Sequence, residues 1–177
     1  MWIGKFALHK DILAVGDHNP GATNVLRAGT WGWFLLALFL DISKGALATA
    51  IPVQLLGLKG WGIVPIALSA PLGHAFSPFL RGRGGKAIAA SFGVWIGLTL
   101  WKIPLLTISL LVFFALFVRP HGWAVLFTLL IIAIVFPFWI PDPVLWAAFG
   151  GPLPILAYTH RNDLKQRPSL RLKEKSA

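Results

Sequence analysis

Cysteine is absent from this chain of 177 residues. Its absence excludes disulfide bonds, a thiolate nucleophile and every metal site that depends on cysteine ligands. Acidic residues are also scarce, with six Asp and Glu against 16 Lys and Arg, and charged residues make up only 12% of the chain. A soluble globular domain has about 25% charged residues, so this composition is not that of an ordinary soluble protein.

Several common catalytic motifs are missing as well. The sequence contains no Gly-x-Ser-x-Gly turn, no His-Glu-x-x-His helix and no paired carboxylates, and neither His74 nor His121 is followed by the Asp typical of soluble acyltransferases. Serine hydrolases, zinc proteases and glycosidases are therefore not indicated. The chemistry that remains is that of basic side chains and backbone amides, which hold phosphates and stabilise developing negative charge.

Apolar residues dominate what is present. They make up 56% of the chain, and the mean hydropathy is +0.74. The net charge of +10 is carried by short gaps between apolar runs and by the C-terminal tail. In a soluble protein this charge would suggest nucleic acid, but its distribution is typical of the positive-inside pattern of membrane proteins. We predict an all-α, polytopic membrane helix bundle that comprises residues 1–177 as one domain and binds no nucleic acid.

Six apolar segments are expected to cross the membrane as helices, which rise ~1.5 Å per residue. Residues 1–16 are too polar for a span and are predicted to be an interfacial lead-in, and residues 160–177 are a basic tail. An even number of spans puts the start and the tail on one side, which the basic residues identify as the cytoplasm. The expected spans are residues 31–58, 60–80, 87–101, 103–118, 122–140 and 143–159.

The stretch 73–86 interrupts apolar sequence with glycine and positive charge. Gly84 and Gly85 permit a close approach of the backbone to an anion. Arg83 and Lys86 supply charge directly before an expected helix, whose N-terminal amides are unpaired. Together these features predict a phosphate cradle. The alternative is an ordinary basic loop between two membrane helices.

Three other features are candidates for a site. The polar loop 17–27, which ends with Arg27, is a second possible anion site or an ordinary loop before a helix. Asp41 and Lys44 share one helix face inside an expected span, where ionisable groups are functional candidates or a structural ion pair. His74 could carry a proton or serve as a structural hydrogen-bond partner.

Four short motifs follow one another in the first half of the chain. They read Asn-Pro-Gly-Ala-Thr-Asn-Val-Leu-Arg at 19–27, Leu-Asp-Ile-Ser-Lys-Gly at 40–45, Gly-His-Ala-Phe-Ser-Pro-Phe-Leu at 73–80 and Arg-Gly-Gly-Lys at 83–86. In order and spacing they resemble the signatures of the PlsY-type acyl-phosphate:glycerol-3-phosphate acyltransferases. The resemblance implies a bacterial inner-membrane enzyme of phospholipid synthesis, which forms lysophosphatidic acid and phosphate.

The same resemblance implies direct attack of a glycerol hydroxyl on the acyl carbonyl, without an acyl-enzyme and without a cofactor. The lack of an activated nucleophile agrees with direct attack. The 19–27 motif is assigned to glycerol 3-phosphate and residues 84–86 to acyl phosphate. Catalytic roles are assigned to Arg27, His74 and Lys86, and no metal ligand is expected. The residues expected to bind substrate are Asn19, Gly21, Thr23, Asn24, Lys44, Ser77, Arg83, Gly84, Gly85 and Asn162.

The chain departs from the family pattern near the expected phosphates. Asp17 and His18 stand where Ser-Gly is usual, and Ala87 stands where a glycine is usual. Asp17 is expected to repel the phosphate of the acceptor, so Asp17→Ser should lower the KM for glycerol 3-phosphate. A protonated His18 is expected to offset that charge.

Other departures lie later in the chain. The usual serine after Arg119 has no clear counterpart, and the closing His-Arg-x-Asn pattern survives as His-Arg-Asn-Asp at 160–163. The first of the seven spans usual in the family is expected to be missing. Two alternatives therefore stay open: a family member that has lost turnover, and a small anion or phosphate-ester transporter, since Asp41, Lys44 and proline-broken spans suit a substrate pathway.

Overall fold

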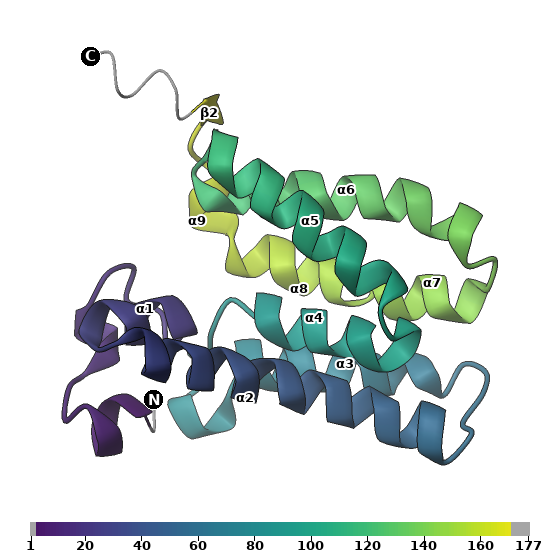
Figure 1. The fold of residues 1–177 in the computed structure, drawn as a ribbon, viewed down its shortest axis with the longest axis horizontal. Coiled ribbons are helices and arrows are strands. Elements are labelled where there is room, and N and C mark those ends of the chain that lie inside the picture. Colours follow the sequence, from purple (N-terminus) through teal and green to yellow (C-terminus); the bar gives the residue numbers. More distant parts are fainter. Residues whose placement is uncertain (1–2, 171–177) are drawn as a thin grey trace.

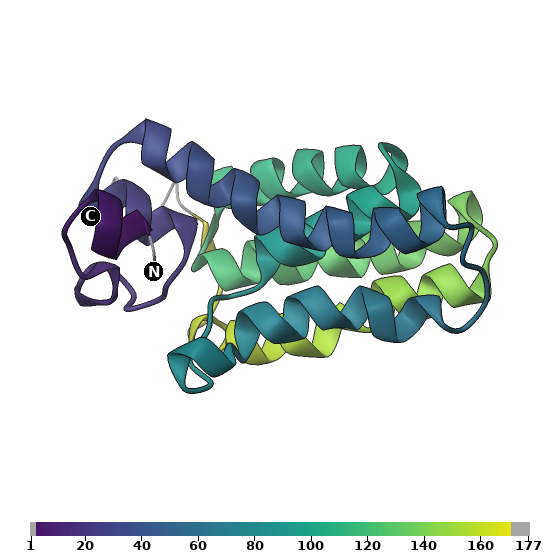
Figure 2. The ribbon, with the colours of Figure 1, turned by 90° about the horizontal axis from the view of Figure 1, so that it is seen from below.

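The structure, a computed structural model, describes residues 3–170, so the last basic residues of the predicted tail lie outside the described residues. The long helices run side by side along a common axis, as expected for an all-α bundle (Figure 1, Figure 2). The α-helices are α1 Ala22–Ala28, α2 Trp31–Ala50, α3 Ile63–Ala75, α4 Ile88–Thr99, α5 Lys102–Phe117, α6 His121–Trp139, α7 Pro143–Gly150, α8 Pro152–Thr159 and α9 Arg161–Leu164.

Shorter elements extend and connect these helices. The π-type segments η1 Ile3–Ala7 and η3 Ile51–Leu55 lie in the lead-in and after α2, and the 3-10 turns η2 Ile12–Ala14 and η4 Pro78–Leu80 precede α1 and follow α3. Two-residue strands β1 Val118–Arg119 and β2 Ser169–Leu170 pair antiparallel, with Arg119 opposite Ser169. This pairing ties the C-terminal segment to the junction of α5 and α6.

Three helical segments of the described chain are long and apolar enough to cross a membrane: Trp31–Leu55, Ile63–Leu80 and His121–Trp139. Helices α4 and α5 are apolar but have only 12 and 16 residues. Helices α7 and α8, with eight residues each, follow one another at residues 143–159, where one span was predicted. The number of six spans therefore stays a prediction.

Helices α2 and α4 pack at very short range because both carry glycine at the contact. A Cβ added at Gly93 would overlap the carbonyl oxygen of Ile42, and one at Gly45 would overlap the backbone of α4. The buried Thr49 donates a hydrogen bond to the Val94 carbonyl at 3.2 Å, across the two helices. In a membrane, such close packing and interhelical hydrogen bonds replace the hydrophobic effect as the main source of helix association.

We expect Gly93→Ala to destabilise the protein by about 1–3 kcal/mol, because the new methyl group forces α2 and α4 apart. A lower thermal unfolding midpoint in detergent would show this. Gly150→Ala is the matched control, since a Cβ at Gly150 meets no atom within 4 Å. Equal midpoints for the two variants would contradict the close packing of α2 on α4.

One end of the bundle gathers the polar connections. Helix α1, the start of α4, β1 and α9 lie together at the left in Figure 1, whereas the α4–α5 and α6–α7 turns lie at the opposite end. In the α6–α7 turn, Asp142 caps α7 by accepting a hydrogen bond from the Val144 amide at 2.8 Å. Loop 17–27, the glycine stretch, the 119–122 connection and residues 160–170 therefore lie at one end of the bundle, as the alternation of the predicted spans requires.

Candidate active site

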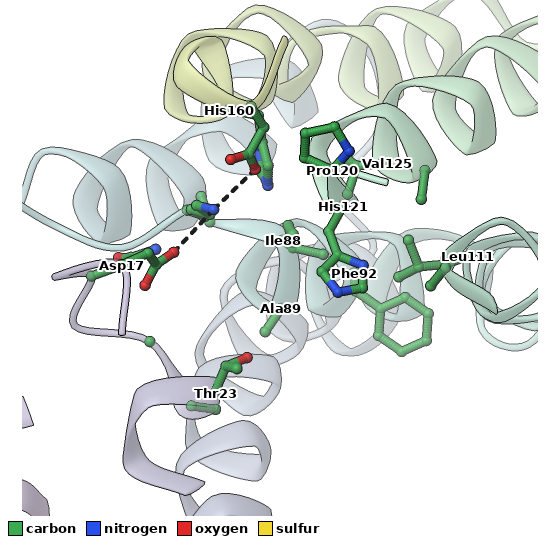
Figure 3. Close-up of a pocket in the computed structure, with 18 of the residues that line it drawn as sticks. Asp17, Thr23, Ile88, Ala89, Phe92, Leu111, Pro120, His121, Val125 and His160 are labelled. Atoms are coloured by element: carbon green, nitrogen blue, oxygen red, sulfur yellow. Dashed lines mark hydrogen bonds and ion pairs between the residues drawn. The ribbon is translucent and has the colours of Figure 1, made fainter. Parts of the chain in front are cut away.

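A cavity of about 810 Å³ opens among these converging segments. Its polar part is formed by the loop before α1, the start of α4, the start of α6 and the α8–α9 junction, and its apolar part extends between α4 and α5. Figure 3 shows Asp17 and His160 at the polar part, and Phe92, Leu111 and Val125 farther along. Seven residues predicted from the sequence line this cavity: Asn19, Gly21, Thr23, Asn24, Arg27, His74 and Lys86.

Lys86 lies at the centre of the polar part. Its ammonium Nζ is 3.1 Å from Oδ2 of Asp17 and 3.1 Å from Oδ2 of Asp163. The hydroxyl of Thr159 donates a hydrogen bond to the Lys86 carbonyl at 3.0 Å, so the backbone of this lysine is fixed to the end of α8. The segment before α1, the start of α4 and α9 therefore meet at one cationic side chain.

A chain of hydrogen bonds links this ammonium to Arg27. The buried amide of Asn24 donates from Nδ2 to Oδ1 of Asp17 at 3.0 Å and to the carbonyl of Asn19 at 2.8 Å. Oδ1 of Asn24 accepts a hydrogen bond from Arg27 at 3.1 Å. Asn24 thus holds a carboxylate on one side and a guanidinium on the other.

The environment of Asp17 differs from the predicted one. Burial raises the pKa of the Asp17 carboxyl, but the hydrogen bond and positive charge of Lys86, together with Asn24 and the Asn19 backbone, hold the pKa below its usual value. His18 turns away, with Nδ1 2.7 Å from the carbonyl of Leu13. The partner that offsets the charge of Asp17 is therefore Lys86, and the compensation assigned to His18 was wrong.

The glycine stretch is built differently from the predicted cradle. The amides of Gly84 and Gly85 donate to the carbonyls of Ala75 and His74, both at 3.0 Å, so they already have partners inside the chain. A Cβ at Gly84 would overlap the carbonyl of His74, and one at Gly85 would overlap the His74 ring. These glycines permit close packing on the end of α3, and the prediction that their amides point at an anion was wrong.

The residues directly after the glycines line the cavity. Lys86, Ala87, Ile88 and Ala89 line it, at the N-terminus of α4, where backbone amides and the helix dipole favour an anion. Ala87 has a φ of 62°, in the left-handed region where glycine is favoured over alanine. Ala87 thus has the backbone conformation of a glycine, the residue that is usual in the family at this position.

His74 belongs to a cluster with the two charged residues of α2. Lys44 Nζ lies 2.7 Å from Oδ1 of Asp41 and contacts Nδ1 of His74, whose Nδ1 is 3.5 Å from the same carboxylate oxygen. Asp41 and His74 line the cavity, whereas Lys44 is exposed and does not. The two charged residues pair as their shared helix face suggests, but only Asp41 lines the cavity.

Other predicted residues lie outside the cavity lining. Gly84 and Gly85 pack against the end of α3, next to Lys86. Arg83 is exposed in the loop before α4, and Asn162 is exposed in α9. In place of Asn162, the neighbouring Asp163 reaches the site. The residues expected to bind substrate that do not line the cavity are Lys44, Ser77, Arg83, Gly84, Gly85 and Asn162.

Several cavity residues had no role in the sequence prediction. Asp163 could have been found, because the His-Arg-x-Asn spacing points to the third residue after His160. Arg119, which contacts His121, and Arg167 add positive charge to the cavity. They are distant in the sequence, and the pairing of β1, which contains Arg119, with β2, which follows Arg167, brings their segments together.

His160 is almost fully buried between the α8–α9 junction and the cavity, with 3% of its surface exposed. Its Nδ1 is 2.8 Å from the carbonyl of Leu156. Because a carbonyl only accepts, this nitrogen carries the proton, and in the neutral ring Nε2 keeps its lone pair. His160 is therefore equipped to accept a hydrogen bond through Nε2.

We expect a pH dependence of stability from His160. Burial lowers the pKa of its imidazole, and the charge of Lys86 acts in the same direction, against the Leu156 carbonyl and the carboxylates of Asp163 and Asp17. Below about pH 6.5 the unfolded state therefore binds more protons than the folded state, and the free energy of unfolding falls as the pH falls. Thermal unfolding followed between about pH 7.5 and 5.5 should show this decline, and His160→Gln should show less of it. An equal decline in the variant would contradict the assignment to His160.

Comparison with known proteins agrees with this architecture. A family profile described as glycerol-3-phosphate acyltransferase matches residues 1–168. A glycerol-3-phosphate acyltransferase of Thermus thermophilus is 38% identical over 161 residues, which cover 88% of this chain and 77% of the relative. One of Lacticaseibacillus casei is 34% identical over 167 residues, covering 93% and 78%.

Solved structures of PlsY, an integral membrane glycerol 3-phosphate acyltransferase, are also similar. The glycerol 3-phosphate form has a TM-score of 0.79 and 28% identity, covering 92% of this chain and 80% of that one. The lysophosphatidic acid form has a TM-score of 0.74 and 29% identity, covering 85% and 76%. These matches confirm the predicted class, an all-α integral membrane bundle, and the resemblance noted in the sequence. The chain belongs to the glycerol-3-phosphate acyltransferase family of membrane enzymes.

Proposed function

We propose that this protein transfers a fatty acyl group from acyl phosphate to glycerol 3-phosphate and releases lysophosphatidic acid and phosphate. The observation that carries the proposal is the change from basic to apolar side chains along the cavity. One part holds Arg27, Lys86, Arg119 and Arg167, and the other is lined by apolar side chains of α4 and α5 such as Phe92. A phosphate head on an acyl tail has the same division of polarity.

The acyl group passes directly from donor to acceptor, without a covalent acyl-enzyme. The glycerol hydroxyl attacks the acyl carbon, the bond from that carbon to the phosphate oxygen breaks, and a substrate phosphate oxygen takes the proton. Lys86 and the amides at the start of α4 stabilise the negative charge on the departing phosphate. The protein contributes mainly positioning and electrostatics.

The hydroxyl groups in the cavity support transfer without an acyl-enzyme. Among the described residues that line it, hydroxyls come from Thr23, Thr107 and Ser169. Thr107 donates its proton to the Ile103 carbonyl at 2.7 Å, deep in α5. The partner of Thr107 is thus a carbonyl and not a histidine of the kind that activates a nucleophile.

We place the protein in the bacterial inner membrane, with the cavity and the C-terminus facing the cytoplasm. Arg27, Lys86, Arg119 and Arg167 lie at the cavity end, which the positive-inside rule assigns to the cytoplasm. The cysteine-free chain allows single-cysteine labelling. A membrane-impermeant maleimide should label Lys59→Cys from outside intact spheroplasts and Lys165→Cys only after permeabilisation; the reverse pattern would contradict this orientation.

The donor is tested by supplying purified protein with glycerol 3-phosphate and, in turn, acyl phosphate, acyl-CoA and acyl carrier protein. Lysophosphatidic acid should form only when acyl phosphate is the donor. Formation from a thioester instead would overturn the donor assignment. No product from any donor, with uptake of glycerol 3-phosphate into proteoliposomes, would favour a transporter, and no product without uptake would favour a member that has lost turnover.

A further inference from the structure

The two carboxylates on Lys86 occupy the place that a substrate phosphate needs. An ammonium has three N–H donors, and here Asp17 and Asp163 take two of them. A phosphate at the third donor would lie within ~4–6 Å of both carboxylates and would be repelled by them. Full contact between Lys86 and a phosphate therefore requires one carboxylate to leave.

The two carboxylates differ in how firmly they are held. The side chain of Asp17 is 46% exposed and sits on a loop between η2 and α1, whereas that of Asp163 is 23% exposed. Asp163 packs against the start of α6, since a Cβ added at Gly122 would come within 2.5 Å of the Asp163 Cβ. Asp17 is thus the carboxylate that can move, and Asp163 the one that stays.

Departure of Asp17 would release two donors at once. Lys86 Nζ and Asn24 Nδ2 both contact this carboxylate, at 3.1 and 3.0 Å. Both would then be available to a phosphate, and Asn24 remains fixed by Arg27 and the Asn19 carbonyl. A phosphate monoester offers acceptor oxygens and negative charge to these same donors.

We propose that Asp17 is an internal competitor for the phosphate-binding site, displaced when substrate binds, and that Asp163 is the positioning residue that keeps Lys86 directed into the cavity. This inference rests on the proposed function, because it explains which anions the proposed active site selects. It replaces the prediction of simple repulsion by Asp17 with competition for one ammonium. Asp17 excludes weakly charged anions from Lys86. Only an anion with more negative charge than a carboxylate binds the ammonium strongly enough to displace Asp17.

The test compares isosteric variants that each remove one carboxylate. Asp17→Asn should lower the Kd for inorganic phosphate, measured by calorimetry in detergent, about two- to fivefold, the scale of one partly exposed ion pair. Asp41→Asn is the matched control: it removes the same charge from the same cavity, but its partners are Lys44 and His74. Competition predicts a clearly smaller change for Asp41→Asn, and equal changes would overturn it in favour of general electrostatics. An unchanged Kd in Asp17→Asn would overturn it as well.

Steady-state kinetics show which substrate phosphate contacts Lys86 and test the role of Asp163. In Asp17→Asn the KM should fall for acyl phosphate, because its departing phosphate meets Lys86 in the proposed transfer; a fall for glycerol 3-phosphate alone would move the phosphate of the acceptor to Lys86 instead. Asp163→Asn should instead lower kcat with little gain in phosphate affinity, and a gain as large as that of Asp17→Asn would overturn the different roles of the two carboxylates. Asp142→Asn, a helix cap at the far end, should change none of these values. If the wild type gave no product, the proposed function would fail while the phosphate titration still decided the competition.

Discussion

Lys86→Gln should lower turnover by a factor on the order of 10²–10³, the usual effect of losing a group that stabilises developing charge. The variant loses the ammonium at the centre of the polar cavity and also leaves Asp17 and Asp163 without their shared partner. Two unpaired carboxylates then face the incoming phosphate and repel it. We expect a lower kcat and a higher KM together, measured by lysophosphatidic acid formation.

A control and a rescue give this prediction its specificity. Lys102→Gln removes a lysine at the start of α5, at the opposite end of the bundle, and should leave turnover unchanged. Adding Asp17→Asn and Asp163→Asn to Lys86→Gln should restore part of the lost affinity, because it removes the unpaired charges. Turnover of Lys86→Gln close to that of the wild type would remove Lys86 from the site.

Gly84→Ala should lower turnover about 10²-fold and lower the unfolding midpoint as well. A Cβ at this position overlaps the carbonyl groups of His74 and Ala75, so the loop that carries Lys86 must move away from the end of α3. A displacement of about 1 Å in a positioning group is enough for a loss of this size. Activity and thermal unfolding measured on the same preparation check both parts of the prediction.

The control for Gly84→Ala is Gly73→Ala, in α3, where an added Cβ meets no atom within 4 Å. The sequence had suggested that Gly84 permits a close approach of the backbone to an anion. The structure instead predicts that the loss of activity comes with a loss of stability. A Gly84→Ala variant that keeps its stability and loses only phosphate affinity would support the original interpretation.

The convergence of the polar segments could be predicted from the sequence because it depends on large-scale patterns. Apolar runs indicate the helices, and the parity of the runs together with the basic residues decides which connections share an end. Arg27 and Lys86, from distant parts of the chain, line one cavity for this reason. The four motifs predicted the family, and each contributes a residue to the lining of the cavity: Asn19, Asp41, His74 and Lys86.

The details of the site depend on contacts that no local pattern contains. The amides of Gly84 and Gly85 could point at an anion or at α3, and only the position of the His74 and Ala75 carbonyls decides between the two. Asp17 was interpreted as a residue that repels a phosphate. Its partner Lys86 is 69 residues away in the sequence, so the ion pair could not be recognised there. Such long-range pairs are fixed by packing, which a sequence alone does not show.

The roles proposed for Lys86 and Asp163 in the reaction depend on one claim: that the cavity holds an acyl phosphate and a glycerol 3-phosphate for direct transfer. The measurement that tests it most directly follows phosphate and lysophosphatidic acid together in the first turnovers after mixing purified protein with acyl phosphate. With glycerol 3-phosphate present, the two products should appear in equal amounts, and without it neither should appear. A burst of phosphate in the absence of glycerol 3-phosphate, equal to the amount of protein, would reveal an acyl-enzyme and contradict the account.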